Sequence, residues 1–273
     1  MKIEIGQALH TGIVRKDHPN QDAIMIWNPL FHMRKGLVLA LADGMGGYEG
    51  GAIASQIVTR SVVKTFRSLS NHTNPLQILD QCFSRAHLEV RRRARGNPKL
   101  ASMGSTIVSL IHNPPYAYVG NIGDSRAYLV RDNFMQQMSK DHTARNASNL
   151  TDQITGGKAD SQIPRSILSQ SISANRTEIS PFLARVETRP NDIWILCSDG
   201  LWSMVDETIL LAVVCNLPPK IAAKRLVEIA NSMGGIDNIS VIIMRWGDGF
   251  TGIKNGDSIN KITDRTDPGE PED

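Results

Sequence analysis

The chain has few cysteines, little net charge and no long apolar run, and each shortage excludes a class of protein. Only three of its 273 residues are cysteine, and no two have the Cys-x-x-Cys spacing of a zinc or redox motif. Three scattered cysteines predict no disulfide framework. The net charge of +3 is too small to indicate binding to nucleic acid or to a membrane surface. No segment approaches the roughly 18 apolar residues of a membrane-spanning helix.

The N-terminal sequence and the composition indicate the setting of the protein and its domain organisation. The first residues, MKIEIGQALHTG, lack the apolar core of a signal peptide, so we expect a cytoplasmic protein in a reducing environment. A hydrophobic content of 41% fits one globular domain, which we predict over residues 1–247. Residues 248–273 are rich in Gly, Asp, Pro, Lys and Glu, and we expect them to form a disordered tail.

The hydrophobic pattern predicts strands and helices in separate blocks. The apolar run 37–42 predicts a strand buried on both faces, and helical spacing follows over 52–69 and 75–95. Short segments rich in β-branched and aromatic residues then predict an antiparallel meander: 106–111, 117–122, 126–131 and 134–138. The polar region 141–180 is expected to be a flap.

The last part of the chain completes the predicted fold class. A strand over 192–197 precedes two helices, 206–215 and 219–233, and a final strand over 239–246. Because strands and helices are grouped rather than strictly alternating, we predict an α+β fold with antiparallel sheets rather than a doubly wound parallel sheet.

Five aspartates share one kind of position, the loop end of an apolar strand: Asp22, Asp43, Asp124, Asp199 and Asp237. Each of them taken singly is typical of a turn. Several carboxylates at one end of a sheet repel one another unless a cation neutralises them. All are hard oxygen ligands and no zinc-type set of His and Cys lies nearby, so the pattern favours Mg²⁺ or Mn²⁺.

A glycine-rich stretch, LADGMGGYEGG at 41–51, follows the first apolar strand and allows two hypotheses. It is either a turn that cradles a nucleotide phosphate or a metal site that uses Asp43 and the backbone beside it. The stretch lacks the third glycine of G-x-G-x-x-G and no βαβ repeat follows, so a dinucleotide-binding oxidoreductase is the weaker alternative. We expect Gly44 to turn the chain with a positive φ and to expose its carbonyl oxygen.

Seven short motifs, taken in order, resemble the bacterial form of the metal-dependent serine/threonine protein phosphatase family, type 2C. They cover nearly the whole chain before the predicted tail. The motifs are Arg15…Asn20-Gln21-Asp22, Asp43-Gly44-Met45-Gly46-Gly47, Gly104-Ser105-Thr106, Gly123-Asp124-Ser125-Arg126, Asp141-His142-Thr143, Ser198-Asp199-Gly200-Leu201 and Gly234-Gly235-Ile236-Asp237-Asn238.

The resemblance implies a four-layer α-β-β-α sandwich, in which two antiparallel sheets are flanked by helices. It also implies two Mn²⁺ or Mg²⁺ ions at one end of the sandwich. Asp43 would bridge both ions. The backbone oxygen of Gly44 would complete the coordination of the first ion, and Asp22 would hold the water molecules bound to that ion. Asp199 and Asp237 would bind the second ion.

The resemblance further implies a third, weaker metal site at Asp124 and phosphate binding by Arg15. The implied reaction is hydrolysis of phosphoserine and phosphothreonine in proteins by a metal-bridged hydroxide, without a covalent intermediate. The implied partners are phosphoprotein substrates and an opposing Hanks-type kinase, with no nucleic acid or membrane, and we expect a monomer. The alternative is a catalytically inactive binding or regulatory module on the same fold.

The sequence departs from the family pattern in three places. Met45 stands where many relatives have a histidine proposed as the general acid, and methionine cannot donate a proton; we expect His142 to be part of a structural turn instead. Arg15 lies farther from Asn20 than in tighter versions of the motif, with Lys16 as the alternative phosphate ligand. The segment 167–172 lacks the usual arginine and the glycine after it, so we expect substrate to dock there in an unusual way.

Overall fold

The computed structural model describes residues 2–28, 36–70, 73–146 and 167–247. The predicted C-terminal tail and half of the predicted flap, residues 147–166, therefore lie outside the described residues, and the domain boundary at 247 stays a prediction. In the described part of the chain, no helix has the length and apolar character needed to cross a membrane.

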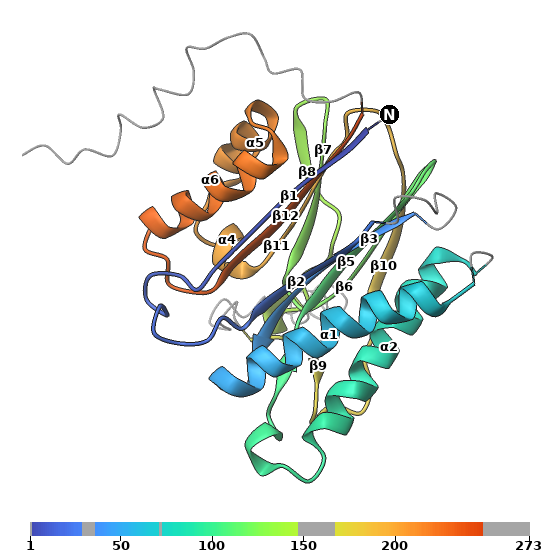
Figure 1. Cartoon of the computed structure of the whole chain (residues 1–273), viewed down its shortest axis with the longest axis vertical. Coiled ribbons are helices and arrows are strands. Elements are labelled where there is room, and N and C mark those ends of the chain that lie inside the picture. The colour runs from blue at the N-terminus through green and yellow to red at the C-terminus, as the bar shows by residue number, and fades with distance from the viewer. Residues whose placement is uncertain (1, 29–35, 71–72, 147–166, 248–273) are drawn as a thin grey trace, which may run out of the picture.

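Two antiparallel sheets form the centre of the molecule (Figure 1). The smaller has the order β1-β12-β11-β7-β8, with bounds Lys2–His10, Ile239–Gly247, Ile193–Cys197, Arg126–Arg131 and Phe134–Gln137. The larger has the order β10-β6-β5-β3-β4-β9, with bounds Phe182–Glu187, Tyr116–Ile122, Ile107–Asn113, Leu37–Met45, Gly104–Ser105 and Ile172–Ser173. Strand β2 (Asp22–Trp27) pairs with β3 in the larger sheet.

Helices cover the outer face of each sheet, which gives the predicted four layers (Figure 1). The helices α1 (Tyr48–Ser68) and α2 (Pro75–Ala94) pack on the larger sheet, followed by the short 3₁₀ helix η1 (Pro98–Leu100). The smaller sheet is covered by α4 (Asp199–Trp202), α5 (Glu207–Asn216) and α6 (Pro219–Ser232). The predicted α+β class and antiparallel sheets are confirmed.

Strand β3 shows why the sequence folds into layers. Its residues alternate between two cores: Val38, Ala40 and Ala42 face the helices, whereas Leu37, Leu39 and Leu41 face the other sheet. A strand with both faces buried needs an uninterrupted apolar run, which is the pattern that predicted it. The inter-sheet core also holds the fully buried Trp194 of β11.

Two sequence-based expectations about strands are corrected by the structure. The predicted meander is two hairpins in different sheets, because β5–β6 belong to the larger sheet and β7–β8 to the smaller. Gly123, with φ 101°, begins the crossing between them, and turn residues alone do not distinguish a crossing from a hairpin. The edge strand β10 follows the polar region without a clear alternating pattern and was not predicted.

Candidate active site

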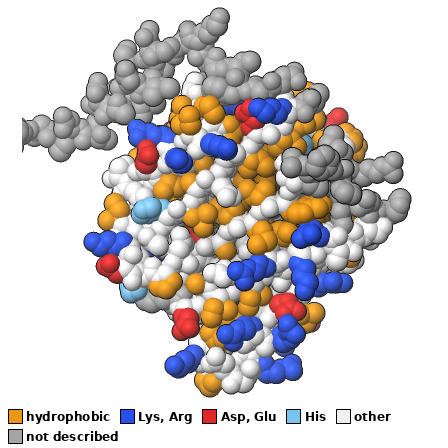
Figure 2. Space-filling model, viewed as in Figure 1, with side chains coloured by type: hydrophobic (Ala, Val, Ile, Leu, Met, Phe, Trp, Pro, Cys, Tyr) orange, Lys and Arg blue, Asp and Glu red, His pale blue; other side chains and the backbone are white. Residues whose placement is uncertain are grey.

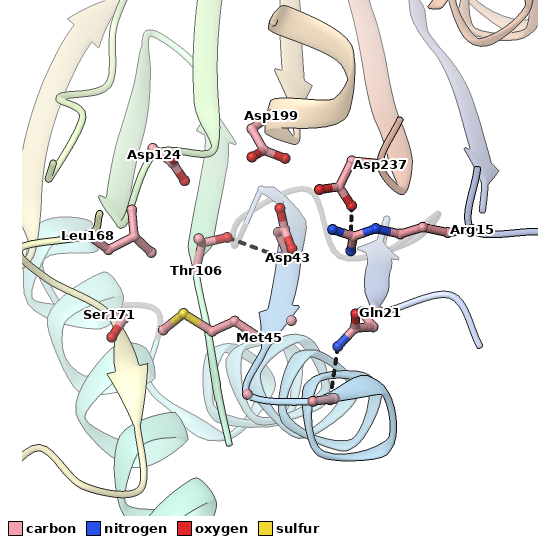
Figure 3. Close-up of a pocket in the computed structure, with 13 residues that line it drawn as sticks. Arg15, Gln21, Asp43, Met45, Thr106, Asp124, Leu168, Ser171, Asp199 and Asp237 are labelled. Carbon is pink, nitrogen blue, oxygen red and sulfur yellow. Dashed lines mark hydrogen bonds and ion pairs between the residues drawn. The ribbon is translucent and has the colours of Figure 1, made fainter. Parts of the chain in front are cut away.

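A cavity of about 420 Å³ opens at the end of the sandwich where the strands carrying the predicted aspartates terminate (Figure 3). Thirteen residues line it: Arg15, Gln21, Asp43, Gly44, Met45, Gly46, Gly47, Thr106, Asp124, Leu168, Ser171, Asp199 and Asp237. Four of the five predicted aspartates and Arg15 thus face one space, although they are separated by up to 222 positions in the chain.

Asp43 lies near the end of β3, and its backbone is held by three hydrogen bonds. Its N–H donates to Thr106 Oγ1 at 3.0 Å, and its carbonyl oxygen accepts from Ser105 Oγ at 2.9 Å and from the Thr106 N–H at 2.8 Å. Thr106 is itself bound to Ser125 through their hydroxyls at 2.7 Å. The Asp43 carboxylate is therefore presented by a rigid backbone.

Asp22 lies directly opposite Asp43 in the pairing of β2 with β3, behind the cavity wall rather than on it. It is 6% exposed, and neither of its carboxylate oxygens has a hydrogen-bond partner. Burial raises the pKa of Asp22 to about 7. The hydroxyls of Ser240 and Ser198 lie near enough to lower the pKa, although neither makes a well-aligned hydrogen bond to the carboxylate, and the charges of Asp199 and Asp237 raise it by less. An unpaired buried carboxylate is costly for a folded protein unless a cation offsets its charge.

The smaller sheet and the crossing between the sheets supply the other three aspartates. Asp199 begins α4 immediately after β11, and its buried Oδ1 has no partner. Asp237 precedes β12, and Asp124 lies at the crossing from β6 to β7. Burial, followed by the charge of Asp199, raises the pKa of Asp237 and raises that of Asp124 to about 7.

The cavity carries a large excess of negative charge. Burial raises the pKa of Asp43 well above its usual range, and the charges of Asp22 and Asp199 raise it further. Arg15 is the only cation among the described residues that line the cavity. Together with Asp22 behind the wall, the four aspartates of the cavity give five negative charges when all are ionised. The Arg15 guanidinium offsets one of them, and two divalent cations would offset the remaining four.

The residues fit hard divalent cations that keep part of their water shell. Among the described residues, no three His, Cys, Asp or Glu side chains are close enough together to enclose one ion. Mg²⁺ is usually held by one or two carboxylates and several waters rather than by an all-protein cage. Carboxylates spaced around an open cavity, with unpaired oxygens on Asp22 and Asp199, suit that mode of binding.

Arg15 reaches the cavity despite its longer spacing from Asn20. Its Nη1 is 2.7 Å from Asp237 Oδ1, and the guanidinium points toward Asp43 (Figure 3). The Asp237 contact leaves other guanidinium N–H groups available to an anion, which Arg can bind with two parallel hydrogen bonds. Lys16 is exposed and does not line the cavity.

A glycine is required at position 44 for a different reason from the one predicted. Gly44 does not have a positive φ; the positive values belong to Gly46 (96°) and Gly47 (91°), which make the turn into α1. A Cβ on Gly44 would clash with the carbonyl oxygen of Gly51. Gly44 is therefore needed because the end of β3 and the first turn of α1 approach closely.

Asn238 ties the loop after β1 to the start of β12. Its Oδ1 accepts from the Gln21 N–H at 2.8 Å, and its Nδ2 donates to the Thr11 carbonyl at 2.8 Å. Gln21 in turn donates from Nε2 to the Gly47 carbonyl at 3.0 Å. Gln21 and Asn238 both belong to the sequence motifs, but no role was predicted for either.

His142 is part of a structural turn, as expected. Its side-chain Nδ1 accepts a hydrogen bond from the Gly123 backbone N–H at 3.1 Å. The backbone N–H of His142 donates to the Gly123 carbonyl oxygen at 2.9 Å. Arg126, from the Gly123-Asp124-Ser125-Arg126 motif, pairs with Asp141 at 2.7 Å, and its guanidinium carbon lies 3.6 Å from the centre of the Trp202 ring. These contacts fix the crossing loop beside Asp124.

Leu168 and Ser171 also line the cavity, on the side opposite Arg15 (Figure 3). They belong to the segment in which the sequence departs from the family pattern. Unusual docking of substrate was expected at this segment, and its place on the cavity wall is compatible with that expectation. The local pattern did not show which of its side chains would face the cavity.

A family model described as protein phosphatase 2C matches residues 11–227. The serine/threonine protein phosphatase PstP of Mycobacterium tuberculosis is 35% identical over 215 residues, which are 76% of this chain but only 40% of PstP. A putative protein phosphatase 2C-type of Streptococcus pyogenes is 33% identical over 248 residues, 87% of this chain and 96% of that protein.

Solved structures give the same relationship at the level of the fold. The crystal structure of M. tuberculosis PstP/Ppp has a TM-score of 0.76 at 28% identity and covers 90% of this chain and 100% of its own. A second structure, the catalytic domain of PstP in complex with two manganese ions, has a TM-score of 0.75 at 28% identity, covering 90% of this chain and 99% of its own.

Proposed function

Because the chain belongs to the protein phosphatase 2C family, we propose that it hydrolyses phosphoserine and phosphothreonine in proteins at a site for two Mn²⁺ or Mg²⁺ ions. The observation that carries the proposal is the cavity in which Arg15 faces four carboxylates, with buried oxygens that lack a hydrogen-bond partner on Asp199 and on Asp22 behind the wall. Carboxylates hold divalent cations, and an arginine beside them can bind a phosphoryl group. All five aspartates are present, so nothing favours the alternative of an inactive binding module.

The proposed roles of the residues are those that the family resemblance implies, and their positions at the cavity are compatible with them. Asp43 and the Gly44 carbonyl would hold the metal ions, and Asp22 would act on water from behind the cavity wall. Asp199 and Asp237 would hold the second ion, and Asp124 would provide the third, weaker site. When bound, the ions supply Lewis acidity toward the phosphoryl group and an activated water.

Arg15 binds and orients the phosphoryl oxygens through the donors that Asp237 leaves available. No cysteine lines the cavity among the described residues, and Cys82 and Cys197 are fully buried in the cores. The hydroxyl of Thr106 is engaged by the Asp43 N–H and Ser125. The absence of a cysteine from the described lining residues and the engaged Thr106 hydroxyl are compatible with the proposed direct attack by water, which needs no side-chain nucleophile.

Phosphoproteins are the proposed substrates, and a Hanks-type serine/threonine kinase is the proposed opposing enzyme. The test is hydrolysis of p-nitrophenyl phosphate and of a phosphothreonine peptide by the full chain, in EDTA and then in Mn²⁺ or Mg²⁺. We expect turnover only with metal. A folded protein that is inactive in every metal would contradict the proposal and favour the binding module.

Met45 lines the cavity but has no ionisable group, so we expect Met45→Ala to change kcat by less than about threefold. The proton for the leaving oxygen then comes from solvent rather than from this position. The measurement is kcat for the phosphothreonine peptide with Mn²⁺, with Met135→Ala, in strand β8 away from the cavity, as the control. A folded but inactive Met45→Ala variant would refute this assignment.

Metal binding should also be visible without turnover. The raised pKa values near 7 of Asp22 and Asp124 mean that the folded metal-free protein retains protons that the unfolded chain has lost above about pH 4. Its stability should therefore fall as the pH rises toward 7. Protons compete with cations, so Mn²⁺ should stabilise the protein more at pH 8 than at pH 6.

The expected rise in Tm at pH 8 is about 5–10 °C at a Mn²⁺ concentration of roughly 100 times Kd. Differential scanning fluorimetry in EDTA and in Mn²⁺, at pH 6 and pH 8, measures both effects. An equal rise in Tm at the two pH values would show that these carboxylates do not hold the ion.

A further inference from the structure

A second cavity lies between α1 and α2 on the outer face of the larger sheet's helical layer. Its volume is about 350 Å³, and it shares no residue with the candidate active site. The residues that matter for its chemistry are Arg60, Lys64, Arg85, Leu88, Glu89 and Arg92, which we call the α1–α2 groove. Lys64 lies 17 positions after Gly47, about 25 Å along α1 from the active-site end of that helix.

The positive charge of the protein is concentrated in this layer. Residues 48–95 contain eight Arg and Lys and three Asp and Glu, an excess of five, whereas the whole chain has an excess of three. The rest of the chain is therefore negative by two. In Figure 2, Lys and Arg side chains gather on the part of the surface formed by α1 and α2.

The cations of the groove are mostly unpaired. Arg92 pairs with Glu89 at 2.7 Å, but Arg60, Lys64 and Arg85 make no ion pair with any described residue. All three are exposed and line one concave surface. Like charges held together in this way repel one another, and a bound anionic group would relieve that repulsion.

Leu88 adds an apolar contact to the groove. Its side chain is 61% exposed, among the largest exposures of a big apolar residue in the described part of the chain, and it lies among the cations. A single exposed leucine is ordinary on a protein surface, but this one lies within the concave surface that the cations line. The groove thus offers one apolar position and several positions for carboxylates.

We propose that the α1–α2 groove docks an acidic peptide segment of a protein partner, with an apolar side chain of that segment against Leu88. Charge complementarity selects the acidic segment. Nucleic acid fits less well, because none of the described residues lining the groove is aromatic, so bases have no stacking surface. The proposal does not depend on the phosphatase reaction, because docking can be measured without turnover.

The test uses a fluorescein-labelled peptide, Asp-Glu-Asp-Glu-Leu-Glu-Asp-Glu, and fluorescence anisotropy with the full chain in EDTA. We expect saturable binding that weakens as NaCl rises from 50 to 300 mM, because exposed ion pairs are screened. The double variant Arg60→Glu with Arg85→Glu should weaken binding at least about tenfold. Hydrolysis of p-nitrophenyl phosphate by this variant should stay unchanged, since neither residue lines the active site.

The matched control is Arg91→Glu with Arg93→Glu, which makes the same charge change on exposed positions of α2 outside the groove. This control variant should weaken peptide binding by less than about threefold. A loss of affinity equal to that of the groove variant would overturn the proposal, because binding would then depend on the overall positive charge of the helices and not on the groove. Leu88→Ala should weaken binding about threefold; an unchanged affinity would overturn the docking mode.

Two further outcomes would also overturn the proposal. One is binding of a labelled oligodeoxythymidine as tight as that of the peptide, which would make the groove a nucleic-acid site. The other concerns residues 264–273, which contain five acidic residues. If replacing those five by their amides in the full chain tightens peptide binding about tenfold, the chain's own segment is the occupant rather than a partner.

Discussion

Asp43→Asn is expected to lower kcat for a phosphothreonine peptide by about a thousandfold while the protein stays folded. The amide has the same shape but cannot supply a full negative charge to a divalent cation, and metal-ion catalysis contributes several kcal/mol to such reactions. The backbone contacts of Asp43 to Thr106 and Ser105 do not involve its side chain, so the substitution leaves the fold in place.

The same substitution should leave the metal-free protein equally or more stable. Burial and the neighbouring carboxylates raise the pKa of Asp43, so at pH 8 the ionised group is unfavourable in the absence of metal. We expect the Tm of Asp43→Asn in EDTA to equal or exceed that of the wild type, and the rise in Tm with Mn²⁺ to be lost. Asp17→Asn, an exposed aspartate outside the cavity, is the control. A folded Asp43→Asn protein with more than a tenth of the wild-type kcat would refute the proposed role.

Arg15→Ala is expected to lower kcat/KM for the phosphopeptide by about tenfold to a hundredfold. The guanidinium supplies charge-assisted hydrogen bonds to the phosphoryl oxygens, each of about 1.5–3 kcal/mol. Arg15→Lys should recover only part of the loss, because an ammonium group cannot contact Asp237 and also present a planar pair of donors.

Lys16→Ala is the matched control for Arg15, since it removes a cation from the adjacent position, which does not line the cavity. Its kcat/KM should change by less than about twofold. The measurement is initial rates over a range of peptide concentrations with saturating Mn²⁺. A larger loss in Lys16→Ala than in Arg15→Ala would transfer the phosphate contact to Lys16.

The sequence by itself determined most of the elements and the residue types of the site. Strand β3 was predictable because a strand packed on both faces needs a continuous apolar run, although it continues through Asp43 to Met45, three residues past the predicted end. The order of the seven motifs also indicated the protein family. The reason given for Gly44 was wrong, because the constraint on it is the closeness of Gly51 in space and not its own φ.

Only the tertiary structure decided how the aspartates come together. Asp22 and Asp43 belong to the larger sheet, Asp199 and Asp237 to the ends of strands in the smaller sheet, and Asp124 to the crossing between them. Periodicity and turn residues describe neighbours in the chain, so they could not show that β6 and β7 lie in different sheets. The cavity forms because face-to-face packing of the two sheets brings their strand ends together, and that packing depends on contacts between residues far apart in the chain.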